Sequence, residues 1–332
     1  MTNPYMFIVG CPRSGTTLLR RMVDAHPLIA VTKESQWFEK SWIAKWFEKR
    51  RGLTPDGRVS SELIALMLEH PKFHRLKISR QQFVDLGRDG ASAHFSSLVT
   101  GIFDHYGQIK GKTRVGNKDP AYVRKLNLLH SLWPQARFVH LIRDGRDVCL
   151  SVMDWRDKGP IAKRKFVTSS DDPVSTVALW WELNVSRGRQ SGKLLGPKLY
   201  YEIRYESLVV RPRVECAALC DFLGLPFDEA VLHSHERQPR PSSDPGLDHP
   251  WMPISPGLRD WRTQMPPEDV ERFEAAAGGL LDELGYVRAA PHPRTESLEH
   301  ASKIRALLAR DPEWIDYSGA RSAKEANEEF VG

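Results

Sequence analysis

Near the start of the chain, the pattern of hydrophobic and polar positions changes from that of a strand to that of a helix. Residues 6–9 form a short apolar run, which is typical of a buried strand. The run ends at Gly10, and from Thr16 onwards apolar side chains recur at helical spacing. Residues 11–15 are therefore predicted to form a tight loop between a strand and a helix. Such a loop can bind an anion, because its amides and the positive end of the helix dipole face the same point.

Along the rest of the chain, apolar runs of strand length alternate with longer segments of helical period. Further strands are predicted at 27–32, 113–117, 137–142 and 198–205. Helices are predicted at 36–50, 60–69, 80–87, 94–106, 174–190, 212–223 and 267–284, around Leu126, Leu129 and Leu132, and around Ser151. This alternation predicts an α/β fold of three layers, in which helices flank a central parallel sheet.

The chain length and the order of these elements predict the domain limits. We expect one domain over residues 1–290, with a helical insertion at about 53–110. Residues 291–332 are charged and helical in pattern, and they predict a helical C-terminal extension. A chain of 332 residues is long enough to bury a large core.

Composition and charge narrow the class of ligand. The hydrophobic content of 41% and the charged content of 27% are ordinary for a globular protein. The formal net charge of +6 comes from 48 basic and 42 acidic residues, without a dense basic block. This mild excess fits an anionic ligand in a cleft better than a nucleic-acid surface, so no nucleic-acid partner is expected.

The cysteine pattern and the N-terminal segment indicate the cellular compartment in which the protein is expected. Four cysteines show no pairing framework, and Cys216 and Cys220 lack the second ligand pair that a zinc site needs. We expect buried free thiols, which are typical of a reducing compartment. Only five residues precede the first strand, so no signal peptide is expected, and no apolar run approaches the roughly 20 residues that span a bilayer. These observations predict a cytoplasmic protein without a membrane span.

The first loop partly matches a nucleotide-binding motif. Gly10 and Gly15 have the spacing of G-x-x-x-x-G-K-[ST], but Thr16 stands where that motif has its lysine. Arg13 lies inside the loop instead. The missing lysine argues against a hydrolase of ATP or GTP. An ordinary strand-to-helix turn, with glycine, proline and serine used for geometry alone, is the structural alternative.

Four features follow predicted strands, where open α/β sheets bind their ligands: the Arg13 loop, Glu34, Lys118 and the segment from Arg143 to Ser151. With them the chain resembles the sulfotransferases that use 3′-phosphoadenosine 5′-phosphosulfate, and most of all the branch that includes the tyrosylprotein sulfotransferases. The resemblance covers about residues 5–286. It is carried in order by PRSGTTLLRRMVDAHP, Glu34, NKDP, RFVHLIRDGRDVCLS, YESLVVRP, DFLG and Trp261. It implies a P-loop-like fold.

The resemblance implies that 3′-phosphoadenosine 5′-phosphosulfate is the sulfuryl donor and 3′,5′-adenosine bisphosphate the product. It implies that no metal is required. The 5′-phosphosulfate would be held by loop residues, namely Arg13, Ser14, Gly15, Thr16 and Thr17. Arg143 and Ser151, in the family spacing R-x7-S, would bind the 3′-phosphate, since both can be directed at one phosphate. Tyr205 would line the nucleotide, and Arg259 is a candidate for a third contact to the 3′-phosphate. Alternatively, Arg143 forms a structural ion pair with Asp147, and Tyr205 is a core residue.

The resemblance also implies the catalytic residues. Glu34 matches the glutamate that acts as general base in the tyrosylprotein branch. Lys118 matches a lysine of that branch that stabilises the sulfuryl group in transfer. Arg13 would contact the phosphate and the bridging oxygen, where negative charge develops during an in-line displacement. In the structural alternatives, Glu34 is a residue at a helix N-terminus, where the helix dipole favours a negative charge. Lys118 then forms only an ion pair, with Asp119 or another carboxylate.

The acceptor is left open by the sequence. A hydroxyl-bearing small molecule, carbohydrate, lipid or peptide fits, because Ser35 and Gln36 replace the residues that help the tyrosylprotein enzymes to bind an acidic peptide. An oligomer is compatible with the sequence. The rival functions are a P-loop small-molecule kinase, against which the missing loop lysine argues, and a catalytically silent nucleotide-binding module.

Overall fold

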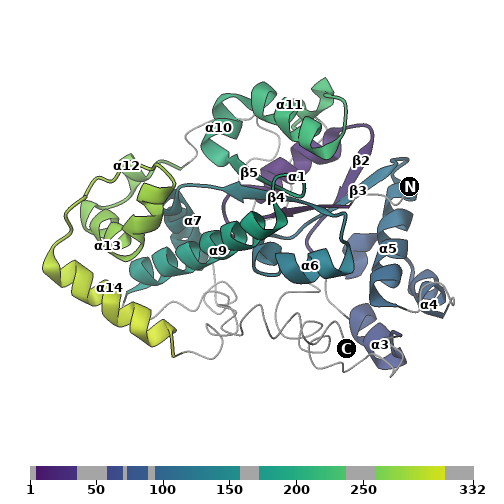
Figure 1. Cartoon of the computed structure of the whole chain (residues 1–332), viewed down its shortest axis with the longest axis horizontal. Helices are drawn as coiled ribbons and strands as arrows, with labels where there is room; N and C mark the ends of the chain where they lie inside the picture. The colour runs from purple at the N-terminus through teal and green to yellow at the C-terminus, as the bar shows by residue number, and fades with distance from the viewer. Residues whose placement is uncertain are drawn as a thin grey trace. The chain divides into compact units, whose positions relative to one another are not determined.

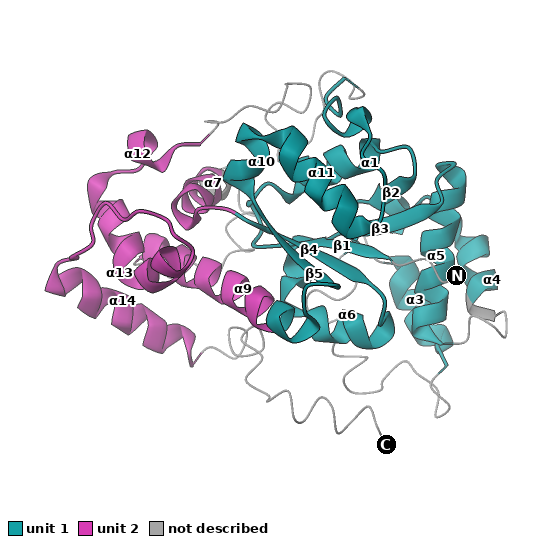
Figure 2. Cartoon of the chain, turned by 45° about the horizontal axis from the view of Figure 1, so that its top comes forward, with its two compact units in different colours: residues 1–142, 191–256 teal, residues 143–190, 257–332 magenta. Residues whose placement is uncertain are grey.

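The computed structural model describes residues 5–35, 58–69, 73–88, 94–157, 172–236 and 259–310. Its contacts divide the chain into two compact units, which Figure 2 shows in different colours. We call residues 1–142 with 191–256 the sheet unit, and residues 143–190 with 257–332 the helical unit. Each predicted site residue can be located in one of the two units.

The sheet unit is built on five parallel strands in the order β2-β3-β1-β4-β5. The strands are β1 (Met6–Val9), β2 (Ile29–Thr32), β3 (Arg114–Lys118), β4 (Arg137–Ile142) and β5 (Tyr200–Arg204). All of the predicted strands are present, and the prediction of a parallel sheet is confirmed. β2 and β5 form the two edges of the sheet.

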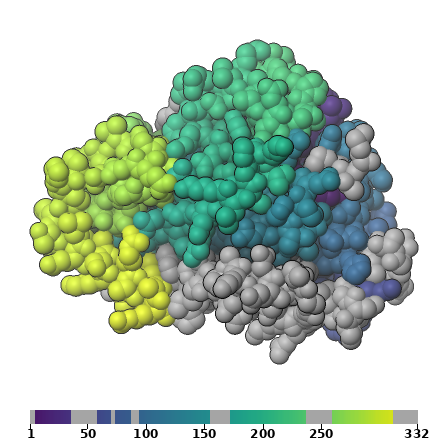
Figure 3. Space-filling model, viewed as in Figure 1, coloured from purple at the N-terminus to yellow at the C-terminus, as the bar shows by residue number. Residues whose placement is uncertain are grey.

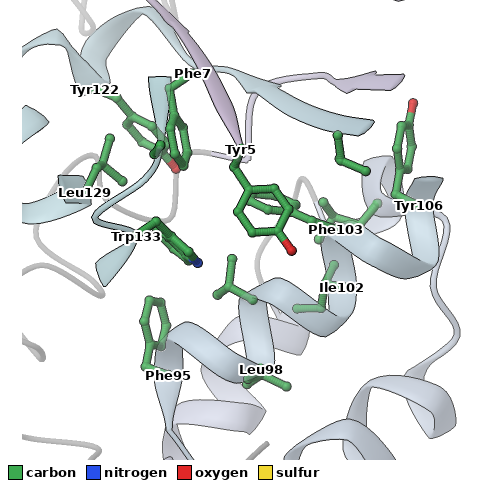
Figure 4. Packing of buried hydrophobic residues seen from close by; sticks show 14 of the residues in the cluster. Tyr5, Phe7, Phe95, Leu98, Ile102, Phe103, Tyr106, Tyr122, Leu129 and Trp133 are labelled. Atoms are coloured by element: carbon green, nitrogen blue, oxygen red, sulfur yellow. The ribbon is translucent and has the colours of Figure 1, made fainter. Parts of the chain in front are cut away.

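Helices cover both faces of this sheet, and Figure 1 shows them on its two sides. On one face, Phe7 and Val9 pack in a core cluster with α5 (Phe95–Ile109), η3 (Pro120–Arg124) and α6 (Leu126–Leu132), as Figure 4 shows from close by. On the other face, Met6 and Ile8 pack with helices α1, α10 and α11. Those helices are α1 (Thr16–Ala25), α10 (Tyr205–Val210) and α11 (Pro212–Leu223). Because β1 is buried on both faces, its sequence is a continuous apolar run rather than an alternation. The predicted three-layer α/β fold is confirmed.

Three short helices and α5 form the described part of the segment predicted as a helical insertion. They are α3 (Ser61–Glu69), η1 (Phe73–Leu76), α4 (Arg80–Arg88) and α5. Leu63, Phe83 and Leu98 from these helices join the core cluster that covers one face of the sheet. The helix predicted at 36–50 lies outside the described residues. The sheet unit also contains η4 (Glu229–Val231).

The helical unit contains α7 (Gly145–Asp157), most of α9 (Pro173–Leu195), α12 (Trp261–Gln264), α13 (Pro267–Glu283) and α14 (Thr295–Leu308). The last of these, yellow in Figure 3, buries Ser297, Ala301, Ile304 and Leu308 along one stripe and exposes most of its other residues. In the described part of the chain, no helix is both long and apolar enough to cross a membrane.

A buried arginine ties several parts of the helical unit together. The guanidinium of Arg146 donates to both carboxylate oxygens of Asp144, at 3.0 and 2.8 Å, and to Glu274 Oε1 at 2.5 Å. It also lies 3.6 Å from the centre of the Trp261 ring. All three charged side chains are buried. Removing the arginine would leave two carboxylates buried without their cation.

Replacing Arg146 with methionine should therefore lower the free energy of unfolding by about 3–5 kcal/mol, as for other buried ion pairs that lose one partner. Denaturant unfolding would measure the loss. The matched control is Arg213→Met, which breaks an exposed ion pair with Glu229 and should leave stability nearly unchanged. Similar small effects of the two substitutions would contradict the central role of Arg146.

Candidate functional site

The first half of the predicted site is the loop from Cys11 to Gly15 between β1 and α1. A side chain at Gly10 would collide with the carbonyl oxygen of Leu141, and Gly15 has a φ of 94°. Arg13 has a φ of 76°, in the left-handed region that non-glycine residues seldom adopt. The loop therefore turns so tightly that glycine is required at both ends and the arginine adopts a strained backbone.

Several polar groups of this loop are suited to an anion. The side chain of Ser14 is fully buried, and its Oγ has no hydrogen-bond partner among the described residues. Because α1 begins at Thr16, the amides of Thr16 and Thr17 precede the first intrahelical hydrogen bonds, which Leu18 and Leu19 donate to the carbonyl oxygen of Gly15. The ring of Tyr205 packs so closely on Gly15 that a Cβ there would lie 2.6 Å from it. Arg13 is half-buried. A phosphate or sulfate group fits this donor set.

Glu34 and Lys118 meet in the sheet unit. The Lys118 Nζ lies 2.6 Å from Glu34 Oε1, and it donates to Thr17 Oγ1 at 3.3 Å. The lysine side chain is 5% exposed, whereas that of the glutamate is 28% exposed. The contact arises because β2 and β3 are neighbours, so that their carboxyl ends lie together. The carboxylate thus remains partly open to a second molecule while its partner is buried.

The helical unit holds the residues predicted to bind a second phosphate, and all of them gather on one face of α7. Asp147, Ser151 and Asp154 lie four and three residues apart, which places them on the same side of the helix. Arg143 lies 3.4 Å from Asp147, and Arg259 lies 2.5 Å from Asp154. Arg143 and Ser151 are buried. Ser151 therefore lies on α7 between the carboxylate partners of the two guanidinium groups, which are separated by about 10 Å of helix rise.

Asp147 links this face to the start of α12. Its Oδ1 accepts a hydrogen bond from the backbone amide of Trp261 at 2.9 Å, while its Oδ2 faces Arg143. Burial raises the pKa of Asp147, and the charge of Arg143 and the amide of Trp261 oppose that rise. The structural alternative for Arg143, an ion pair with Asp147, is thus present.

The cysteines follow their prediction. Cys11, Cys149, Cys216 and Cys220 are all buried and free. Burial raises the pKa of Cys216 to about 12 and that of Cys220 to about 11, so neither thiol is poised for nucleophilic chemistry. In the described ranges, no group of three or more histidine, cysteine, aspartate or glutamate side chains could hold a metal ion.

Sequence reasoning located Glu34 and Lys118 but missed the residues around them. Asn117 and Tyr122 hydrogen-bond to the segment that carries Glu34. The only signal for them was their place beside Lys118 in and after the NKDP motif.

Comparison with known proteins shows the fold and the family of this chain. The chain is 26% identical to protein-tyrosine sulfotransferase A of Caenorhabditis elegans over 331 residues, which covers 98% of this chain and 77% of that protein. It is 25% identical to the protein-tyrosine sulfotransferase of Drosophila melanogaster over 291 residues, which covers 85% of this chain and 52% of the fly protein. Among solved structures, the sulfotransferase domain of the Synechococcus PCC 7002 olefin synthase has the same fold, with a TM-score of 0.56 and 24% identity, over 86% of this chain and 95% of that domain. The model of the sulfotransferase family matches residues 4–229. The chain therefore belongs to the sulfotransferase family.

Proposed function

We propose that this sulfotransferase moves a sulfuryl group from 3′-phosphoadenosine 5′-phosphosulfate to an acceptor hydroxyl, with Glu34 as the general base. The observation that carries the proposal is the pair formed by Glu34 and Lys118, 2.6 Å apart, with Thr17 of α1 beside the lysine. It joins a carboxylate that can take a proton to a cation that can stabilise an anion. Membership of the family supports sulfuryl transfer as the reaction.

In the proposed step, Glu34 takes the proton of the acceptor hydroxyl while the acceptor oxygen forms a bond to sulfur. The bond between sulfur and the bridging oxygen breaks, and its electron pair stays on the 5′-phosphate of the product. Arg13 stabilises this developing charge, Lys118 stabilises the sulfuryl group in transfer, and Thr16 and Thr17 add donors from the first turn of α1. A sulfate ester and 3′,5′-adenosine bisphosphate leave, with the proton on Glu34.

Arg143, Ser151 and Arg259 are proposed to bind the 3′-phosphate, the group by which this donor differs from adenylates that lack it. The place of Ser151 on α7, between the carboxylate partners of the two arginines, supports this role. An arginine offers a planar set of donors that matches phosphate oxygens. Tyr205, packed on Gly15, would contact the nucleotide.

The acceptor is proposed at the level of a hydroxyl group. The names of the relatives from Caenorhabditis elegans and Drosophila melanogaster state that those proteins act on protein tyrosine. A tyrosyl hydroxyl in a peptide is therefore the first acceptor to assay, followed by small phenols, carbohydrates and lipid alcohols. The cytoplasmic location stays a prediction, supported by the four buried free thiols.

The donor can be tested by calorimetry without metal. We expect 3′,5′-adenosine bisphosphate to bind at least about 10-fold more tightly than AMP, because charge-assisted hydrogen bonds to the 3′-phosphate are lost with AMP. Labelled phosphosulfate donor would then be assayed with the hydroxyl acceptors named above. A preference for magnesium-ATP would contradict the proposal and favour a kinase. Tight bisphosphate binding without transfer to any acceptor would favour a silent module.

A further inference from the structure

We propose that Asn117 and Tyr122 are positioning residues that hold Glu34 against Lys118. This inference rests on the proposed role of Glu34 as general base, and it adds two residues to the machinery of that site. The starting point is the place of Glu34 in the chain. It lies two residues beyond β2, which among the described strands is an edge strand paired with β3.

Glu34 lies just beyond the end of the β2–β3 ladder. The register of the two strands ends where Thr32 faces Asn117. The segment from Lys33 to Ser35 therefore lies past the last pair of the sheet, and side chains from β3 and η3 hold it.

Asn117 holds the beginning of this segment. Its Nδ2 donates to Thr32 Oγ1 at 2.7 Å and to the carbonyl oxygen of Lys33 at 3.4 Å. Asn117 and Thr32 are both fully buried, so the bond between their side chains does not compete with water. Asn117 directly precedes Lys118, the last residue of β3. One strand end thus holds the segment of Glu34 with one residue and its carboxylate with the next.

Tyr122 holds the end of the segment. Its hydroxyl lies 2.9 Å from Ser35 Oγ, and both residues are buried. The ring of Tyr122 packs in the core cluster of the sheet unit, as Figure 4 shows. The hydroxyl is therefore a fixed point, and Ser35 is anchored to the core immediately after Glu34.

Burial decides which contacts set the position of the carboxylate. The Glu34 side chain is 28% exposed, and partly exposed ion pairs contribute little by themselves. The contacts of Asn117 and Tyr122 are buried and flank Glu34 on both sides in the chain. They leave the glutamate little freedom besides its own rotamer. Such preorganisation matters because an error of about 1 Å in a catalytic group can cost about 100-fold in rate.

The test compares Asn117→Ala and Tyr122→Phe with the wild-type enzyme in sulfuryl transfer and in calorimetry with 3′,5′-adenosine bisphosphate. Each variant should lower kcat by about 10- to 100-fold and change bisphosphate affinity and the donor KM by less than about 2-fold. In an enzyme that already carries Glu34→Gln, neither substitution should lower kcat further, since both act through the glutamate.

Two matched variants control for loss of a buried polar contact. Tyr5→Phe removes a hydroxyl that donates to Asp104 Oδ1 at 2.9 Å from the same core cluster as Tyr122. Asn184→Ala removes a buried asparagine that donates to the carbonyl oxygen of Trp180 at 2.7 Å on α9. Both controls should keep the wild-type kcat.

The proposal is overturned if Tyr122→Phe keeps the wild-type kcat. It is also overturned if the losses are as large in the Glu34→Gln background, or if bisphosphate affinity falls as much as kcat. Tyr122→Phe keeps the ring packing, so it remains decisive if Asn117→Ala does not fold. An inactive wild-type enzyme would fail at the proposed function itself, which separates that failure from a failure of the positioning residues.

Discussion

Replacing Glu34 with glutamine is expected to lower kcat by about 10²- to 10⁴-fold, the range that general bases contribute. Glutamine keeps the shape of the side chain and can still accept a hydrogen bond from Lys118, but it cannot take the proton of the acceptor hydroxyl. Affinity for 3′,5′-adenosine bisphosphate should stay within about 2-fold, because the proposed donor contacts come from other residues. Initial rates with labelled donor and calorimetry would measure the two quantities separately.

The helical unit offers a closely matched control for this substitution. Glu182 lies 2.6 Å from Arg305, and its side chain is 24% exposed, against 28% for Glu34. Glu182→Gln therefore breaks an ion pair of the same length at a glutamate of similar exposure, with a more exposed cation, and it should leave kcat unchanged. If Glu34→Gln retained most of the wild-type kcat, another group would have to accept the proton. Equal losses in both variants would point to a general effect of breaking ion pairs.

The strands could be predicted where burial on both faces requires a continuous apolar run in the sequence. β1 and β4 match their predicted limits because both lie inside the sheet, between two layers of helices, and consist of continuous apolar runs. The short helix α10 could not be predicted. It begins at Tyr205 directly after β5, without glycine or proline between them, and ends in two valines that favour strands. Tyr205 and Leu208 are buried in the core, so tertiary packing decides its conformation.

In the site, too, local sequence predicts only the contacts between residues that are close in the chain. The pair of Arg143 and Asp147 could be anticipated, because Arg143 stands just before the first turn of α7, which carries Asp147. The contact between Glu34 and Lys118 depends on β2 and β3 being neighbours, and strand order is set by the packing of the whole sheet. Asn117 and Tyr122 were missed because their hydrogen bonds are made to a segment that is distant in sequence. Local patterns locate residue types, whereas the partners of those residues come from topology.

Replacing Arg143 with alanine is expected to weaken binding of 3′,5′-adenosine bisphosphate by roughly 10- to 100-fold, the cost of losing charge-assisted hydrogen bonds. Binding of AMP, which has no 3′-phosphate, should change by less than about 2-fold. The difference between the two ligands isolates the 3′-phosphate, because any general damage to the protein would weaken both. Calorimetry on the wild type and the variant, without metal, gives all four affinities.

A double variant separates two explanations of that loss. Without Arg143, the carboxylate of Asp147 keeps the amide of Trp261 but loses its cation. Burial already raises the pKa of Asp147, so the folded protein binds this proton more tightly than the unfolded chain does. The carboxylate therefore costs stability as the pH rises through its raised pKa, and loss of Arg143 should increase that cost. Arg143→Ala combined with Asp147→Asn removes both the unpaired charge and this pH dependence. If Arg143 contacts the phosphate, the double variant should bind the bisphosphate as weakly as Arg143→Ala alone. Recovery of affinity would assign the loss to repulsion by Asp147 and contradict a phosphate contact for Arg143.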